Sequence, residues 1–317
     1  MKIPSILPAA YLCLLLAATA CQTNSCRDEV VCETYVHRYG VPLQANDWSA
    51  RGQHGQVVST RRDGVVVSKT YESGILHGET TYTFPHRELI QRKEVYCQGE
   101  LVQESSYYPN GMPQQQINYD SGKHSLTAWY EGGVPQCKEE YEQGHLVQGS
   151  YYNLSNHEES RVEDRNGTRT RRDAYGQLIS VDSIQNGQMT MCTTYHPNGT
   201  PAALTPYANG VIEGKRRTFT VGGEPATIEE WTNNSQHGNT EIFDNGEKCA
   251  DMPYINGRPH GVERRYRDND KVVQRRNWIQ GKKHGPCYNY IGNTTQTDWY
   301  FQGRQVNKPT YDMLSNQ

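Results

Sequence analysis

The sequence has few hydrocarbon-rich side chains for its 317 residues. Phe occurs four times and Trp five times, and hydrophobic residues make up 34% of the chain. Tyrosine is the exception, with 22 copies. So few aliphatic side chains cannot fill a thick globular core, whereas broad tyrosine rings can cover a thin sheet. The composition therefore favours an extended architecture.

A strong charge imbalance is also missing. The 32 basic and 35 acidic side chains leave a formal net charge of −3 at pH 7. Low hydrophobicity combined with high net charge would indicate disorder, but here the charge is nearly balanced. An acidic, exported chain is also poorly suited to binding nucleic acid, so we expect none.

No apolar run reaches the roughly 20 residues that a membrane-spanning helix needs. The longest extends from Ile3 to Leu16, follows the charge of Lys2, and is succeeded by the small residues 17–20 and by Cys21. This order is typical of a signal peptide over residues 1–20. We expect an exported protein.

Small residues ending in a cysteine resemble the lipobox of bacterial lipoproteins. That resemblance implies that Cys21 becomes the acylated N-terminus, carrying palmitate or a similar chain, and that Gln22 directs it to the outer membrane. The run Ala18–Ala20 equally suits ordinary signal peptidase, which would release a secreted chain. We therefore expect a lipoprotein of the cell envelope, with secretion as the alternative.

The cysteines do not form a recognisable framework. Apart from Cys13 and Cys21, seven remain, an odd number at wide spacings with no CxxC pattern. Cys26 and Cys32 form the only plausible local disulfide pair. Motifs of catalysis are missing too, since the chain has no G-x-S-x-G, H-E-x-x-H or Walker-type loop. We expect no enzymatic activity, no cofactor and no metal.

Turn residues recur about every 23 residues. Gly and Asn tolerate the positive φ of tight hairpin turns, which gives their spacing a structural meaning. Two interleaved series imply two strands per repeat. The first series contains Gly52, Gly74, Gly99, Gly122, Gly144, Gly167, Gly187, Gly210, Asn234, Gly257, Gly281 and Gly303. The second contains Gly64, His86, Gly111, Gly133, Asn156, Gly176, Gly199, Gly223, Gly246, Asn269 and Gly292.

An apolar or aromatic residue stands three positions before nearly every first-series turn. This stripe is predicted to be buried, and the segments between turns alternate as β-strands do. The spacing predicts an all-β fold, an elongated twisted antiparallel sheet of about eleven hairpin repeats. The stripe contains Tyr71, Tyr96, Tyr119, Tyr141, Ile184, Tyr207, Trp231, Tyr254, Trp278 and Tyr300.

The repeats set the predicted boundaries. After the signal, residues 21–45 are expected to be a lipid-anchored tether, 46–305 the repeat array, and 306–317 a polar tail. The least regular repeat spans 153–176 and is strongly charged, which favours a bend or loose packing there. We expect the array to stay a single domain.

The turns resemble a known repeat. Stretches such as Gly74–Gly78, Gly257–Gly261 and Gly281–Gly285 are similar to the G-x-x-x-G turn of MORN-type repeats. The match is to the bacterial variant found in YwqK-family antitoxins, and it covers about 46–305. The resemblance implies the same β-hairpin fold and allows an antitoxin or immunity role.

Histidines share one slot of these turns, at His54, His77, His237, His260 and His284. Successive repeats lie about 10 Å apart, too far for two imidazoles to share a zinc ion. We expect each ring to bond turn backbone instead.

Basic residues concentrate between 258 and 283, with nine cations against three acids. Strand geometry allows a shared cationic face that would attract lipid headgroups or an acidic protein. The alternative is a solvated face that keeps the sheet soluble. The candidate binding residues are Arg264, Arg265, Arg267, Lys271, Arg275, Arg276, Lys282 and Lys283.

Three functions follow from these features. The first is a non-enzymatic envelope lipoprotein that binds or scaffolds a protein or membrane-surface partner through its β-repeat face. The second is an antitoxin or immunity protein of a toxin–antitoxin system. The third is an enzyme, which the missing motifs disfavour.

Overall fold

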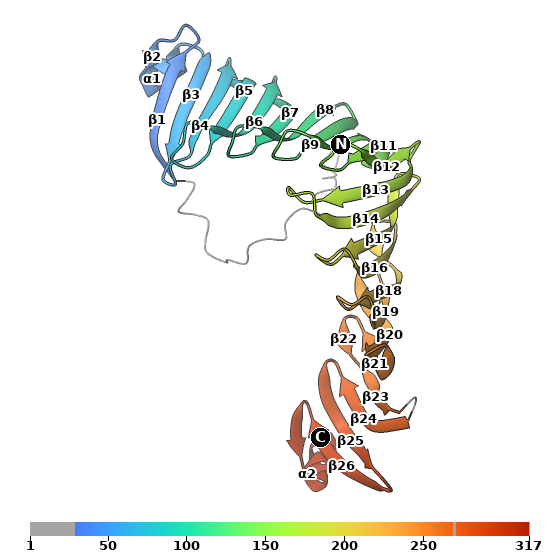
Figure 1. Ribbon diagram of the computed structural model, residues 1–317. Coiled ribbons are helices and arrows are strands. Elements are labelled where there is room, and N and C mark those ends of the chain that lie inside the picture. The colour runs from blue at the N-terminus through green and yellow to red at the C-terminus, as the bar shows by residue number, and fades with distance from the viewer. Residues whose placement is uncertain (1–28, 269–270, 317) are drawn as a thin grey trace, which may run out of the picture. The chain divides into compact units, whose positions relative to one another are not determined.

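The computed structural model describes residues 29–268 and 271–316 (Figure 1). The predicted signal peptide, Cys21, Cys26 and the predicted turn residue Asn269 lie outside these residues. The described chain is almost entirely β, with 27 strands and two short helices. The all-β prediction is confirmed: consecutive strands pair antiparallel as hairpins in an open sheet.

The chain divides into two compact units, residues 1–159 and 160–317. The division falls inside the irregular repeat 153–176, and strand β12 (Glu158–Glu163) crosses it. The high charge of the repeat 153–176 leaves it little apolar surface to bury. The two units are described separately.

In the first unit, β1 pairs with β2 and β3, and from β3 to β11 each strand pairs with the next. The elements are β1 (Val30–His37), β2 (Pro42–Leu43), α1 (Ala45–Ala50), β3 (Gly55–Arg61), β4 (Val66–Glu72), β5 (Ile75–Thr83), β6 (Ile90–Cys97), β7 (Glu100–Tyr107), β8 (Pro113–Asp120), β9 (Lys123–Trp129), β10 (Pro135–Glu142) and β11 (His145–Tyr152).

The second unit continues the same antiparallel pattern. Its elements are β13 (Asn166–Arg172), β14 (Leu178–Gln185), β15 (Gln188–Tyr195), β16 (Pro201–Ala208), β17 (Val211–Ile212), β18 (Gly214–Phe219), β19 (Pro225–Thr232), β20 (Ser235–Asp244), β21 (Glu247–Ile255), β22 (Arg258–Pro259), β23 (Gly261–Arg267), β24 (Lys271–Ile279), β25 (Lys282–Ile291), β26 (Thr294–Phe301), β27 (Arg304–Val306) and α2 (Lys308–Ser315).

The predicted turns carry the left-handed backbone that hairpins need. At Asn256–Gly257, for example, φ is 49° and 75°, the pattern of a type I′ turn. One prediction is wrong: Gly167 lies within β13, opposite Val162 and Ile184. The turn instead uses Asp164 and Arg165, with φ of 45° and 69°. The glycine signal misplaced it because two non-glycine residues adopt the left-handed conformation there.

The sheet also begins earlier than the predicted array. Strand β1 lies inside the predicted 21–45 tether and pairs along its length with β3. The β1 sequence is rich in β-branched and aromatic residues, which favour strands. It contains no turn glycine, so the repeat spacing did not reveal it. The predicted tail contains helix α2, which Asn307 caps by accepting a hydrogen bond from the Thr310 amide.

Both short helices cap a terminal hairpin. The buried Trp48 of α1 packs against Tyr35 and Tyr71, with ring centroids 5.7 and 6.2 Å apart. In the second unit, Tyr311 of α2 packs against Trp299 at 5.0 Å. In a repeat array each unit contacts only its neighbours, so these aromatic contacts add to the packing of the first and last described hairpins. In the described residues, no helix is long and apolar enough to cross a membrane.

The core of each sheet is a row of mostly polar side chains, one from each strand. Cross-strand pairing aligns Thr80, Glu94 and Glu139 in the first unit, and most buried polar residues of the chain belong to this row. We call this side of the sheet the inner face. In the second unit it carries Asp182, Cys192, Thr205, Arg216, Glu229, Thr240, Met252, Glu263, Arg276, Cys287 and Asp298.

The predicted aromatic stripe is therefore not the core. Of its ten members only Ile184 is buried, and the other nine are half-exposed. The rings lie beside the polar row, partly in water, and the hydroxyl or indole groups of Tyr96, Tyr141, Trp231 and Trp278 donate to inner-face carboxylates. The small aliphatic content follows, because carboxylates and rings replace hydrocarbon.

Candidate binding surface

Buried carboxylates on the inner face are held by aromatic donors. In the first unit, Tyr141 and Tyr151 donate to the two oxygens of Glu139 at 2.8 and 2.9 Å. Glu139 is only 2% exposed. Tyr82 and Tyr96 both donate to one oxygen of Glu94, Oε2, each at 3.1 Å. These bonds satisfy the acids from within the sheet. The inner face is thus largely occupied by its own contacts.

The acid also changes the titration of the ring that binds it. Burial, followed by the charge of Glu94 and the hydrogen bond to it, raises the pKa of Tyr96 to about 12. Tyr96 therefore stays protonated and remains a donor at physiological pH. The ring has a structural role in binding Glu94.

In the second unit, Glu263 is almost completely enclosed, with 1% of its surface exposed. It accepts hydrogen bonds from Arg265 Nε at 2.7 Å and from Trp278 Nε1 at 2.9 Å. Arg276 lies 3.5 Å away on the neighbouring strand. Two arginines and an indole thus converge on one buried carboxylate.

Glu229 has a similar setting. Trp231 Nε1 and Arg216 Nη1 donate to it at 2.8 and 2.9 Å, and Thr227 donates at 2.9 Å. Burial alone would raise the pKa of this carboxyl, but the hydrogen bonds outweigh it, and the pKa is lowered. The ionised form is therefore the one that folding stabilises.

The opposite side of each sheet, the outer face, is polar in the first unit. Cross-strand pairs align one row of hydroxyl, amide and amino side chains there: Ser68, Thr81, Lys93, Ser105, Gln116, Thr127, Lys138 and Ser150. A single-layer sheet has no second layer to cover such a row. Most of these side chains remain partly or fully exposed.

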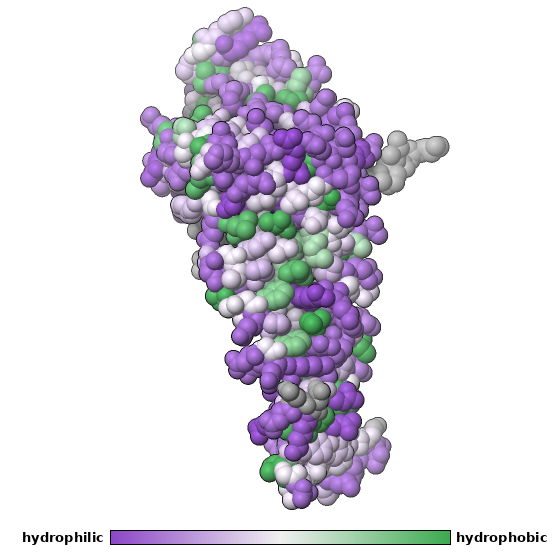
Figure 2. Space-filling model, turned by 45° about the vertical axis from the view of Figure 1, so that its right-hand side comes forward, coloured by the Kyte–Doolittle hydropathy of each residue, from purple (hydrophilic) through white to green (hydrophobic). Residues whose placement is uncertain are grey.

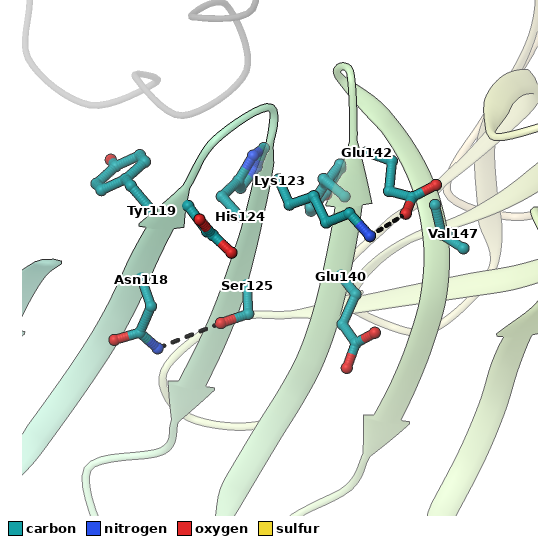
Figure 3. Close-up of a pocket in the computed structure, with 10 residues that line it drawn as sticks. Asn118, Tyr119, Lys123, His124, Ser125, Glu140, Glu142 and Val147 are labelled. Atoms are coloured by element: carbon teal, nitrogen blue, oxygen red, sulfur yellow. Dashed lines mark hydrogen bonds and ion pairs between the residues drawn. The ribbon is translucent and has the colours of Figure 1, made fainter. Parts of the chain in front are cut away.

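A shallow pocket opens on β8–β11 of this unit (Figure 3). Asn118 donates to Ser125 Oγ at 3.2 Å across β8 and β9, and Lys123 pairs with Glu142 at 2.6 Å. His124 stacks on Tyr141 at 4.5 Å, and burial lowers the pKa of the imidazole. Three pairs of lining residues thus contact each other, and the pocket offers a polar, hydrogen-bonding surface.

The outer face of the second unit changes character along the sheet. It begins with apolar side chains at Val181, Leu204 and Ile228, and continues through charged ones. The charged part runs through Glu241, Asp251, Arg264 and Arg275 and ends at Tyr288 and Thr297. The side of the molecule drawn in Figure 2 is mainly hydrophilic, with smaller groups of hydrophobic residues between.

The predicted basic residues do not form one surface. Arg265 and Arg276 lie on the inner face beside Glu263. Lys283 Nζ lies 5.9 and 5.0 Å from the ring centres of Trp278 and Tyr300. These three cations stabilise the sheet through an ion pair or ring contact.

The remaining predicted cations are more exposed. Arg267 and Lys271 face each other next to the turn, and Lys282 lies beside the first-series turn opposite Ile279. Arg264 and Arg275 are direct cross-strand partners on the outer face and line a shallow pocket with Val272 and Tyr290. Only this last pair occupies the centre of the outer face.

Four of the five histidines bond turn backbone, as predicted. Ring Nδ1 atoms of His54 and His77 accept from the amides of Ser73 and Gln98 at 3.2 and 3.3 Å, and His260 and His284 do the same for Gln280 and Gln302. The bond reaches the turn of the following repeat, so it links repeats. Among the described residues, no three His, Cys, Asp or Glu side chains gather as metal ligands.

The sequence contains a signal for the polar core that the spacing of turns and aromatics does not show. An acid stands two residues before the stripe aromatic in Glu94-Val95-Tyr96, Glu139-Glu140-Tyr141, Glu229-Glu230-Trp231 and Asp298-Trp299-Tyr300. Two residues apart on a strand means the same face, so this spacing predicts an acid beside each ring. Glu263 gives no such signal, because its indole partner comes from the next strand.

Residues 102–121 match the family model described as MORN repeat variant. The matched segment covers most of the β7–β8 hairpin and its turn. The chain contains a MORN repeat variant. The hairpins flanking this MORN-type repeat share its turn spacing and its cross-strand pairing. Among curated proteins none matches the chain.

Solved structures give weaker likenesses. S. aureus TarM shares 10% identity at a TM-score of 0.17; the match covers 45% of this chain and only 22% of the TarM chain. BamB from Moraxella catarrhalis shares 10% identity at a TM-score of 0.15. That match covers 78% of this chain and 82% of the BamB chain. A porin-like protein from Bacteroides uniformis shares 9% identity at a TM-score of 0.16. That match covers 84% of this chain and 92% of the porin-like chain.

Proposed function

We propose that this protein is a non-enzymatic lipoprotein of the cell envelope that binds a macromolecular partner through the outer face of its sheet. Cys21 would carry the acyl anchor and hold the chain at the outer membrane. The sequence before Cys21 supports the anchor, and the MORN-type repeat supports a binding role. The exposed polar side chains of the outer face support the choice of that face as the binding surface.

The contrast between the two faces carries the proposal. Inner-face acids such as Glu139 and Glu263 are enclosed and fully engaged by rings and arginines. Outer-face residues such as Lys138, Arg217 and Arg275 are exposed. The chain therefore uses one face for its own stability and leaves a broad polar surface available.

The pockets agree with a large partner better than with a small substrate. Both are shallow, and both are lined by side chains of three or four adjacent strands. Enzyme sites usually bury most of a small ligand in a deep cleft. The thiol of Cys192 also makes a poor nucleophile, because burial and the neighbouring Asp182 raise its pKa to about 11.

Affinity purification of the full chain from envelopes tests the proposal. We expect recovery of one or more envelope partners, and loss of that recovery when Lys138, Arg217 and Arg275 are replaced by Gln. Wild-type recovery by the triple variant would contradict binding through this face. A single toxin-like partner would instead indicate the antitoxin or immunity role.

The anchor has a separate test. Palmitate labelling of the expressed protein should disappear in the Cys21→Ala variant, and the variant should leave the membrane fraction. Cys32→Ala, which keeps Cys21, is the matched control. Labelling that persists without Cys21 would reject this attachment site.

A further inference from the structure

Arg264 and Arg275 face each other directly across strands β23 and β24. Side chains at such positions have Cβ atoms about 5 Å apart, and like charges placed there repel each other. Both arginines are exposed on the outer face. The sheet therefore holds two cations together at some cost to its own stability.

Nearby carboxylates do not neutralise the pair. Asp251 is the cross-strand neighbour of Arg264, but Lys248, Tyr266 and Asn239 already bond its two oxygens, at 2.8, 2.5 and 2.9 Å. Within the described residues, no carboxylate lies within 4.0 Å of either guanidinium. This contrasts with Arg265 and Arg276, which converge on Glu263.

Aromatic side chains form the rest of the site. Tyr288 is the cross-strand partner of Arg275, and its ring stacks near Tyr290 with centroids 6.5 Å apart. Tyr290 and Val272 complete the shallow pocket that the two arginines line. The site thus combines two adjacent cations with the apolar side chain of Val272 and a phenol hydroxyl.

We propose that Arg264 and Arg275 bind the phosphoryl group of a phosphate ester, with Tyr290 and Val272 contacting the group that carries it. A carboxylate has two oxygens, which one guanidinium fork satisfies, whereas a phosphoryl group offers oxygens on several sides to two forks at once. Its negative charge would also remove the repulsion between the arginines. The inference rests on the proposed binding role of the outer face and names the chemistry of one part of it.

Titration of the purified full chain with glycerol 3-phosphate tests the site. Saturable binding is expected, beyond the effect of chloride at equal ionic strength. Arg264→Gln and Arg275→Gln should each weaken it about tenfold or more, the loss of a charge-assisted hydrogen-bonding partner. Lys282→Gln, which removes one exposed cation elsewhere in the cluster, should leave the affinity within about twofold.

A second arm identifies the source of the phosphate. Vesicles of phosphatidylcholine with and without phosphatidic acid are tested with the same variants. Arginine-dependent binding of soluble glycerol 3-phosphate, or of phosphatidic acid vesicles alone, supports the site and distinguishes a soluble ester from a lipid headgroup. Equal losses in Lys282→Gln and Arg275→Gln, or no saturable binding in either arm, overturns it.

Stability gives a readout that needs no ligand. Without phosphate, Arg264→Gln should unfold at a slightly higher temperature than wild type, because a cross-strand repulsion is removed. A clearly lower temperature would mean that Arg264 is structural and would overturn the proposal. Because these experiments use purified protein, their failure is separate from a failure to find an envelope partner.

Discussion

Trp278 donates its indole N–H to Glu263 at 2.9 Å, joining neighbouring strands β24 and β23 through a buried carboxylate. The same acid receives Arg265 and Arg276. Two residues that sequence reasoning assigned to a partner-binding patch are therefore engaged by this buried acid on the inner face. This relationship decides which substitutions should affect stability and which should affect binding.

Replacing Glu263 with Gln should destabilise the second unit by about 3 kcal/mol, since it removes the charge that compensates two arginines and an indole donor. Urea unfolding, followed by tryptophan fluorescence, measures the change. Glu247→Gln, at an exposed position on β21, is the matched control and should cost less than about 0.5 kcal/mol. Similar midpoints for both variants would show that the buried cluster contributes little.

Acid should weaken the fold through Glu229. In the folded state its pKa lies below the ordinary value of 4.5, because hydrogen bonds from Trp231, Arg216 and Thr227 outweigh the effect of burial. A depressed carboxyl pKa adds stability above the unfolded value, and that stability is lost as the pH falls through the folded value. We expect the unfolding free energy to fall below about pH 4.5, and to fall less steeply in Glu229→Gln. The exposed Glu224→Gln should keep the wild-type slope.

Turn chemistry should show at Gly257. Its φ of 75° is strained for alanine, whereas Asn234 occupies the equivalent turn slot with φ of 62°. Gly257→Ala should therefore cost about 1 kcal/mol, and Gly257→Asn clearly less. Thermal unfolding of the two variants compares them directly. Equal cost would mean that the left-handed conformation does not limit this turn.

The histidine links between repeats should be visible in hydrogen exchange. His77 accepts a bond from the Gln98 amide, so His77→Ala should speed exchange at Gln98 while leaving mid-strand amides of β6 unchanged. His237→Ala is the control, because the described structure shows no such bond from that ring. An unchanged rate at Gln98 would mean that the link does not protect the turn.

Sequence periodicity predicted the fold because turns depend on local backbone chemistry. Gly or Asn at regular spacing determines where hairpins reverse, and the described positions from Gly74 to Gly303 follow it, apart from Gly167. The array start was less predictable, since β1 contains strand-forming residues but no turn signal. The aromatic stripe correctly identified the inner face of the sheet, but its residues are not the buried core. Rings can donate to a buried acid while they remain partly exposed.

The basic cluster shows the limit for sites. Alternation along one strand separates Arg264 from Arg265, but the partner of each depends on cross-strand register and on bulges such as the one between Arg265 and Tyr266. Sequence alone contains neither. A count of charges over 258–283 therefore combined cations that bind Glu263 on the inner face with cations of the outer face, and only the paired strands distinguish them.

Photo-crosslinking in intact cells tests binding through the outer face most directly. A photoreactive residue is placed at Lys138 or Arg217 on the outer face, or at Glu131 in an exposed turn. Crosslinks to an envelope component from positions 138 and 217, with none from 131, are predicted. Equal crosslinking from all three positions, or crosslinks from 131 alone, would contradict binding through that face.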